Sequence, residues 1–241
     1  MGNIKNSKKW VVPILMFIFC EFIYRQHLVK YLLDRDYLVV NFFENSFLNK
    51  TFSFGLLNFA IAVIILLISK FIFKEKLTSI DSSDKMSLRK SAIIVFSAVV
   101  VTIIVFYLLT YIIYDILGSS VNSAAAMYIR EISMRNKYIY VIFTFFTVTF
   151  EEVVYRKLLF GYLYDLHSGC NKYVRFITSA LVSSIIFGAT HDGVLHPAMI
   201  YYVIYGIIFS SVYFYTKRIS ASMTVHVLNN LFLAMMDIFG T

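Results

Sequence analysis

The sequence has few of the residues that build secreted, fibrous or soluble proteins. Only 15% of its 241 residues are charged, against roughly 25% in ordinary globular domains. Its two prolines and nine glycines exclude collagen-like, proline-rich and flexible-linker architectures. Its two cysteines, Cys20 and Cys170, fit neither a disulfide framework nor a structural zinc site, and both are expected to be free thiols.

Apolar side chains dominate instead. Hydrophobic residues make up 59% of the chain, which is more than a soluble core of this size accommodates. The formal net charge is +8, but the basic residues lie between the apolar runs, where they orient a membrane protein against an anionic lipid surface. This distribution excludes nucleic-acid binding as a main function and predicts a lipid bilayer as the surrounding medium.

Seven apolar runs are long enough to cross a hydrocarbon core of about 30 Å as helices. They are residues 10–24, 52–73, 91–117, 138–165, 173–191, 198–215 and 220–239. The stretch Leu28–Phe43 is apolar but interrupted by charges, and it is expected to lie as a helix in the membrane interface. The predicted fold class is therefore all-α, a polytopic helical membrane protein with about seven transmembrane helices.

The basic residues also predict an orientation. With the N-terminus inside, the inner segments carry twelve Lys and Arg residues and the outer segments seven, with Arg25 counted among the outer ones. This asymmetry places the N-terminus on the cytoplasmic side of a cell membrane. The first run contains Glu21 and lacks a small-residue cleavage site, so it is expected to remain as an anchor rather than to be a signal peptide. The sequence predicts no oligomeric state.

Three groups of polar residues interrupt the apolar runs of the C-terminal half. They are Glu151-Glu152-Val-Val-Tyr-Arg156, Phe187-Gly-Ala-Thr-His191 and His226-Val-Leu-Asn-Asn230. An ionisable group inside a span costs roughly 2.5–3.5 kcal/mol on insertion scales, so such groups are functional or paired. Glu152 and Arg156 are four residues apart and are predicted to pair on one helix face. Glu151 points about 100° away from that face and is free to hold water.

Helical rise places these groups at comparable depths. Measured from the adjacent inner turns, Glu151 lies about 21 Å along its helix and His191 about 28 Å, at 1.5 Å per residue. His226 and Asn230 lie about 12–18 Å along theirs. The four side chains are therefore expected to meet within one layer of the membrane interior, although a purely structural ion cluster of Glu151 and Glu152 with Arg156 and Lys157 stays open.

A carboxylate, two imidazoles and an amide suit hydrolysis of a peptide bond by an activated water molecule. Glutamate can act as a general base on water, and histidine and asparagine can donate hydrogen bonds to a developing oxyanion. No histidine is followed by Glu as in the His-Glu-x-x-His zinc proteases, and no Gly-x-Ser-x-Gly elbow is present. The aspartates lie near span ends, which disfavours an aspartyl dyad.

The order Glu-Glu-x-x-x-Arg, Phe-x-x-x-His and His-x-x-x-Asn resembles the CAAX protease and bacteriocin-processing enzymes, also called the CPBP or Abi family. The resemblance covers roughly residues 138–239, and Ser220-Ala-Ser-Met resembles the family's lead-in to its last motif. It implies that residues 138–241 form a four-helix catalytic core and that residues 1–137 are a separate N-terminal transmembrane region of about three spans plus the interfacial segment.

The resemblance also implies roles for the motif residues. Glu151 would be the water-activating base, His191 would orient the water, and His226 and Asn230 would form the oxyanion hole. The remaining motif residues are Glu152 and Arg156, which would be structural or would orient the substrate, and Phe187, which would shape the cavity wall. The implied activity is that of an intramembrane glutamate-type peptidase without a metal, acting on a small membrane-associated peptide or protein such as a bacteriocin or pheromone precursor.

Two alternatives stay open at the level of sequence. One is a metal-dependent protease in which Glu151, His191 and His226 are zinc ligands around an open position. The other is a non-catalytic membrane protein that binds a partner in the same cavity, as a bacteriocin self-immunity factor or a scaffold. No cofactor is expected, but the sequence does not exclude zinc.

Overall fold

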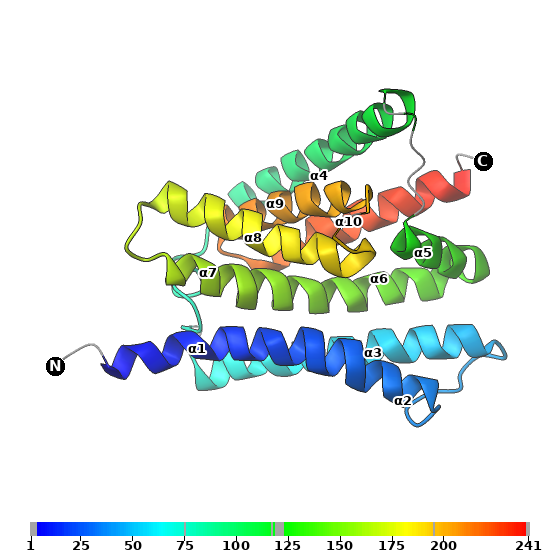
Figure 1. Ribbon diagram of the computed structural model, residues 1–241, viewed down its shortest axis with the longest axis horizontal. Helices are drawn as coiled ribbons and strands as arrows, with labels where there is room; N and C mark the ends of the chain where they lie inside the picture. Colours follow the sequence, from blue (N-terminus) through cyan, green and yellow to red (C-terminus); the bar gives the residue numbers. More distant parts are fainter. Residues whose placement is uncertain (1–3, 75, 117, 119–122, 195, 240–241) are drawn as a thin grey trace.

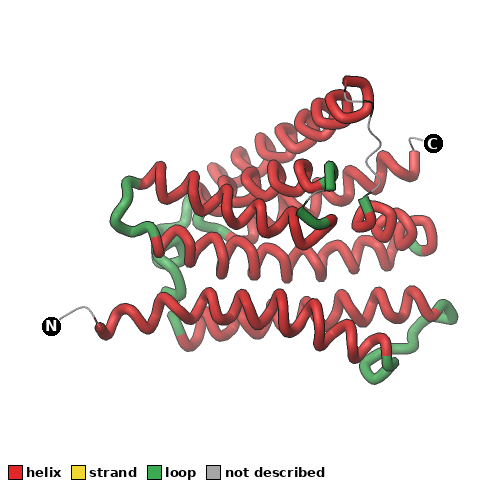
Figure 2. The backbone as a smooth tube through the Cα atoms, viewed as in Figure 1, coloured by secondary structure: helices red, strands yellow, loops and turns green. Residues whose placement is uncertain are grey.

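The computed structural model describes residues 4–74, 76–116, 118, 123–194 and 196–239. Within these ranges every regular element is a helix and no strand occurs (Figure 2). Seven helical spans are long and apolar enough to cross a membrane: Val11–Asp34, Ser46–Ile72, Leu88–Ile116, Lys137–Leu166, Lys172–Asp192, Met199–Thr216 and Ile219–Met236. These spans confirm the prediction of an all-α polytopic membrane protein.

Several spans combine α-helical and π-helical stretches. The first consists of α1 (Ile4–Ile18), η1 (Phe19–Val29) and α2 (Lys30–Asp34), the second of α3 (Ser46–Leu67) and η2 (Ile68–Ile72), and the third of α4 (Leu88–Thr110) and η3 (Tyr111–Ile116). The fourth consists of α6 (Lys137–Glu151), η4 (Glu152–Phe160) and α7 (Gly161–Leu166). The last three are α8 (Lys172–Asp192), α9 (Met199–Thr216) and α10 (Ile219–Phe239). The short helix α5 (Ala124–Arg135) precedes α6.

Polar side chains in the connections set where several helices begin. Asn45, Asn136 and Asn171 precede α3, α6 and α8, and each side-chain oxygen accepts a hydrogen bond from a backbone N–H of the first turn. Ser123 does the same for α5. Such caps satisfy N–H groups that have no partner within the helix. The starting residues of these four helices are thus encoded locally.

The first span is longer than predicted. The prediction ended it at residue 24, whereas the helix continues to Asp34. Glu21 and Arg25 lie one turn apart and form an ion pair of 2.6 Å, so these charges neutralise each other within the helix and do not end it. The predicted interfacial helix over Leu28–Phe43 is wrong, because residues 28–34 complete the first span and residues 35–45 form a turn and an irregular connection.

The helix α5 was not predicted, because its 12 residues carry no apolar run long enough to be read as a span. It packs against α6 and α10. Its first turn is linked to the end of α8, since Ser123 Oγ donates a hydrogen bond to Asp192 Oδ2 at 2.6 Å. Both cysteines are free, as expected: Cys20 is buried and Cys170 is exposed.

The span containing η4 lies at the centre of the bundle. In Figure 1, α1 and α3 lie on one side of α6 and α7, and α8, α9 and α10 lie on the other. The contacts agree, because η4 packs against α1 on one side and against α8, α9 and α10 on the other. The helix α4 packs against α9 and α10 from outside and is set at an angle to the other spans (Figure 1). The central span therefore meets both halves of the chain.

Candidate active site

The carboxylate of Glu151 lies between two imidazole rings. Glu151 is the last residue of α6, His191 lies near the end of α8 and His226 lies in the first half of α10. The distance from Glu151 Oε1 to His191 Nε2 is 3.7 Å, and that from Glu151 Oε2 to His226 Nε2 is 3.8 Å. Both distances exceed a direct hydrogen bond, and polar contacts of this length are typically bridged by a water molecule.

Each ring is held by its other nitrogen. His191 Nδ1 lies 2.7 Å from the carbonyl oxygen of Phe187, and His226 Nδ1 lies 2.9 Å from Glu152 Oε1. Because these oxygens accept, the hydrogen-bond partners assign the proton to Nδ1 in both rings. The two Nε2 atoms, rather than the Nδ1 atoms, therefore face Glu151.

Aromatic neighbours fix the planes of the same two rings. Tyr202 stacks on His191 with ring centroids 4.4 Å apart and planes at 23°. Phe209 stacks on His226 at 4.4 Å and 24°. The Tyr202 hydroxyl lies 3.1 Å from Ser123 Oγ, the cap of α5. Hydrogen bonds and stacking together leave each imidazole one orientation.

The predicted pair of Glu152 and Arg156 is present and supports His226. Both side chains are fully buried, and Arg156 Nε lies 3.5 Å from Glu152 Oε2. The hydroxyl of Ser222, in the Ser220-Ala-Ser-Met segment, donates to the same Glu152 oxygen. A second carboxylate that accepts from Nδ1 orients the imidazole.

Phe187 forms part of the cavity wall. It is buried, and its ring centroid lies 4.4 Å from that of His191 and 6.0 Å from that of His226. The guanidinium of Arg156 lies 4.5 Å from the centre of the same ring, a cation–π contact that holds this cation away from solvent. One phenylalanine thus separates the Arg156 cation from the cavity.

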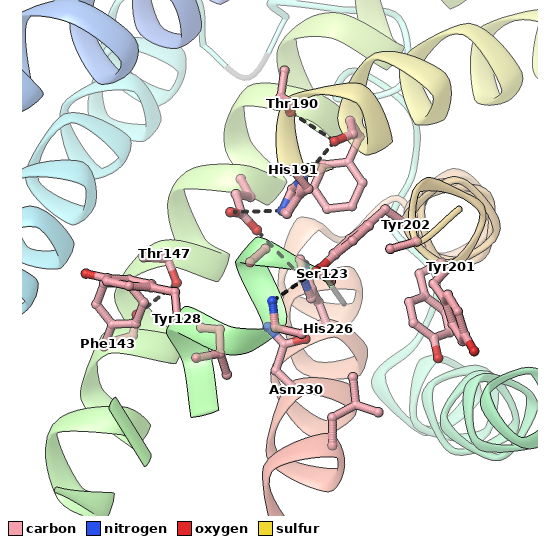
Figure 3. Close-up of a pocket in the computed structure, with 18 of the residues that line it drawn as sticks. Ser123, Tyr128, Phe143, Thr147, Thr190, His191, Tyr201, Tyr202, His226 and Asn230 are labelled. Carbon is pink, nitrogen blue, oxygen red and sulfur yellow. Dashed lines mark hydrogen bonds and ion pairs between the residues drawn. The ribbon is translucent and has the colours of Figure 1, made fainter. Parts of the chain in front are cut away.

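Asn230 lines the same cavity one helical turn beyond His226. Its backbone carbonyl accepts a hydrogen bond of 2.6 Å from the hydroxyl of Tyr140 in α6, which fixes α10 against the helix that carries Glu151. Its side-chain oxygen lies 3.5 Å from Asn229 Nδ2. The structure thus brings Glu151 together with His191 and His226. Asn230 lies beside the two histidines on the cavity wall (Figure 3).

The cavity has a volume of about 930 Å³ and is lined by residues from both halves of the chain. Its wall is mostly apolar and aromatic, and besides the motif residues it includes side chains of α3, α4, α5 and α9. A concave apolar pocket with a few convergent polar groups is the usual form of a ligand site. Among the residues that the structure describes, no group of three or more His, Cys, Asp and Glu is arranged to hold a metal ion.

Arg25 is a site residue that the sequence motifs do not predict. Its Nη1 atom lies 3.4 Å from Glu151 Oε1, although it was counted as a basic residue of an outer segment. The signal that could have found it is the acidic and basic pair Glu21 and Arg25, four residues apart within one apolar run. Such a pair marks one helix face that must be buried in the protein.

Comparisons with known proteins agree with the motifs. Residues 133–232 match the family model described as Type II CAAX prenyl endopeptidase Rce1-like. The chain is similar to the membrane-embedded CAAX protease MroQ of Staphylococcus aureus (strain USA300), with 36% identity over 90 residues, which are 37% of this chain and 35% of MroQ. It is also similar to the membrane peptidase YdiL of Bacillus subtilis (strain 168), with 33% identity over 88 residues, which are 36% of this chain and 32% of YdiL.

These matches confirm the resemblance to the CAAX protease family. The matched segment contains all three motifs, from Glu151 to Asn230. The chain spans about a third of the length of the curated relatives that it matches. No solved structure matches the chain.

Proposed function

We propose that the protein is an intramembrane endopeptidase that hydrolyses a peptide bond through a water molecule activated by Glu151. The observation that carries the proposal is the Glu151 carboxylate held between His191 Nε2 and His226 Nε2 at 3.7 and 3.8 Å on the wall of the large cavity. The family match over residues 133–232 supports the same conclusion.

The geometry supports a different role for each of the two histidines. Because Nδ1 of His191 donates to a carbonyl, its Nε2 accepts a hydrogen bond from the attacking water and orients it. Glu151 takes a proton from that water as the water oxygen bonds to the carbonyl carbon. When the carbon–nitrogen bond breaks, Glu151 gives this proton to the leaving amine.

His226 and Asn230 would stabilise the oxyanion of the tetrahedral intermediate. To donate from Nε2, His226 must carry protons on both nitrogens, and the Glu152 carboxylate 2.9 Å from its Nδ1 stabilises that imidazolium. The Asn230 amide on the same helix face supplies a second donor to the cavity. The roles of Glu152 and Arg156 are to hold His226 in place.

The substrate class proposed is a small membrane-associated peptide or protein, of the kind matured into a bacteriocin or pheromone. A cavity of about 930 Å³ holds a peptide segment of a few residues, since pockets of about 300–1,000 Å³ enclose drug-sized ligands. We place the protein in the cell membrane with a cytoplasmic N-terminus. The first span contains both Arg25 and Lys30, so five of the seven basic residues counted outside lie beyond that span, and the excess of basic residues inside supports this orientation.

The decisive experiment compares the peptides released by cells carrying the wild type, Glu151→Gln or Glu131→Gln. Glu131 is an exposed glutamate paired with Arg135, so its variant is a matched control for the loss of one carboxylate. We expect peptides that are present with the wild type and Glu131→Gln and absent with Glu151→Gln, at equal amounts of membrane protein. In vitro, loss of the base lowers the rate by about 10²–10⁴-fold. Identical peptides in all three strains would refute the proposal, and immunity that survives in Glu151→Gln would indicate a binding protein.

The reaction is proposed to need no metal. The Glu151 carboxylate, the orienting imidazole and the oxyanion donors together supply what water activation requires. We therefore expect activity to survive prolonged treatment with EDTA and 1,10-phenanthroline. Activity that is lost on chelation and restored by added zinc would identify Glu151, His191 and His226 as ligands instead.

A further inference from the structure

Glu151 has a third partner that comes from the first span. Arg25 lies in η1, and its Nη1 atom is 3.4 Å from Glu151 Oε1. Its side chain is 11% exposed and that of Glu151 is 12% exposed, so the contact is made away from bulk solvent. Arg25 lies outside the segment 133–232 that matches the family model, so the family match assigns it no role.

The guanidinium of Arg25 is itself held rigidly. Its Nε and Nη2 atoms donate to Glu21 Oε1 at 3.1 and 2.6 Å, and Gln26 Nε2 donates to the same oxygen at 3.0 Å. The planar group also lies 5.6 Å from the ring centre of Phe150, the residue before Glu151. Because the guanidinium donors form a fixed fork, two of them bound to Glu21 determine where Nη1 points.

We propose that Arg25 is a positioning residue for Glu151, which fixes the carboxylate between the two imidazoles and keeps it ionised in the membrane interior. Its donor binds Oε1, which also faces His191, and leaves Oε2 turned toward His226. A cation within about 4–6 Å favours the charged form of a carboxyl group. Glu21 acts through Arg25, so the first span completes a centre whose motif residues all lie in the C-terminal half.

The catalytic test rests on the proposed function and uses the full chain in membranes. With a peptide identified by the comparison above, we expect Arg25→Gln to lower kcat by about tenfold or more while KM stays within about threefold, because the ground-state contacts of the peptide remain. Arg25→Lys keeps a cation and should restore part of kcat. The control is Arg35→Gln, which removes an exposed arginine at the end of the same helix and should change neither constant.

A second test needs no substrate. Dicyclohexylcarbodiimide is an apolar reagent that reacts with protonated carboxyl groups, and mass spectrometry locates the modified residue. Without the neighbouring cation, Glu151 should be modified at least about threefold faster in Arg25→Gln than in the wild type or Arg35→Gln. Glu152, which pairs with Arg156, should be modified at an unchanged rate and serves as the internal control.

The outcomes separate this inference from the proposed function. If no peptide is cleaved by the wild type but Glu151 reacts faster in Arg25→Gln, the proteolytic function fails and the positioning role stands. If Arg25→Gln is unstable because Glu21 is left unpaired, the double variant Glu21→Gln with Arg25→Gln removes both charges and is measured in the same way. Unchanged labelling of Glu151 together with an unchanged kcat in a folded variant would overturn the inference.

Discussion

The third and fourth spans have nearly equal lengths and opposite surroundings. The third, Leu88–Ile116, has a mean hydropathy of 2.9 over its most apolar window, and 11% of that window is buried in the protein. The fourth, Lys137–Leu166, has a mean hydropathy of 1.3, and 67% of its window is buried. The more polar span thus lies at the centre of the bundle, and the more apolar span lies at its edge (Figure 1).

This contrast reverses the rule for soluble proteins, because the surrounding medium is lipid. An apolar side chain gains little by leaving hydrocarbon for the protein interior, whereas a polar one gains partners there. The fourth span carries Glu151, Glu152 and Arg156, and each pairs with another helix or within its own. The polar groups of a span, more than its apolar ones, therefore indicate whether it lies inside the bundle.

The strongest test of the contrast truncates one phenylalanine in each span. Phe160 in η4 is 0% exposed and packs against aromatic rings of α7, α8 and α9, while Phe96 in α4 is 72% exposed. We expect Phe160→Ala to lower the free energy of unfolding by about 3–5 kcal/mol, because it leaves a cavity. Phe96→Ala should change it by less than about 0.5 kcal/mol, as for other surface substitutions. Unfolding by SDS in mixed micelles measures both, and equal losses would contradict the contrast.

A smaller effect is expected where α8 and α9 approach closely. A Cβ atom added at Gly206 would lie 2.7 Å from Ser184 Oγ and 3.1 Å from its Cα atom. Gly206→Ala should therefore destabilise the protein by about 1–3 kcal/mol through overpacking. Small residues allow such backbone approach between spans.

The matched control is Gly169→Ala in the exposed turn before α8, where an added Cβ meets nothing within 4 Å. This control should leave the free energy of unfolding within about 0.5 kcal/mol of the wild type. Adding Ser184→Gly to Gly206→Ala should restore part of the loss, because the two sites share one contact. Equal stability of Gly206→Ala and Gly169→Ala would show that α8 and α9 can move apart without loss of stability, which would contradict this prediction.

The smallest effect concerns a charge in the turn between α9 and α10, outside both spans. Burial and the nearby positive charge of Lys172 lower the pKa of Lys217 to about 8. Since its pKa is lower in the folded than in the unfolded chain, stability should rise as the pH increases from about 8 toward the usual lysine range. Acetylation of Lys217, followed by mass spectrometry, should have its midpoint near pH 8. Lys172→Gln should move that midpoint to higher pH. A midpoint that does not move would show that burial alone lowers the pKa of Lys217.

Much of the fold could be predicted, because lipid imposes length and hydropathy on every span. All seven runs correspond to helices that can cross a membrane. The prediction failed for segments whose structure depends on tertiary contacts. The charge at Arg25 favoured an early end of the first span, although it pairs with Glu21 within that span. The helix α5 is short and is held by Ser123 and by packing on α6 and α10.

The candidate site could be predicted for a similar reason. Each motif places polar groups one helical turn apart inside an apolar run, and depth along the helix was enough to bring Glu151 together with His191 and His226. The depth of a residue within the membrane does not show which helix contacts the other side of the Glu151 carboxylate. Arg25 was missed because its contact with Glu151 joins residues 126 positions apart, a separation that no local pattern encodes.

The contacts of Glu151 also constrain when the centre can form during biosynthesis. Its partners lie at positions 25, 191 and 226, so the last of them leaves the ribosome only with the seventh span, long after the first. Since translation proceeds from the N-terminus, a nascent chain that has inserted only its first six spans carries the glutamate without the imidazole of α10. The side chains at positions 25, 151, 191 and 226 can therefore come together only after α10 has entered the bilayer.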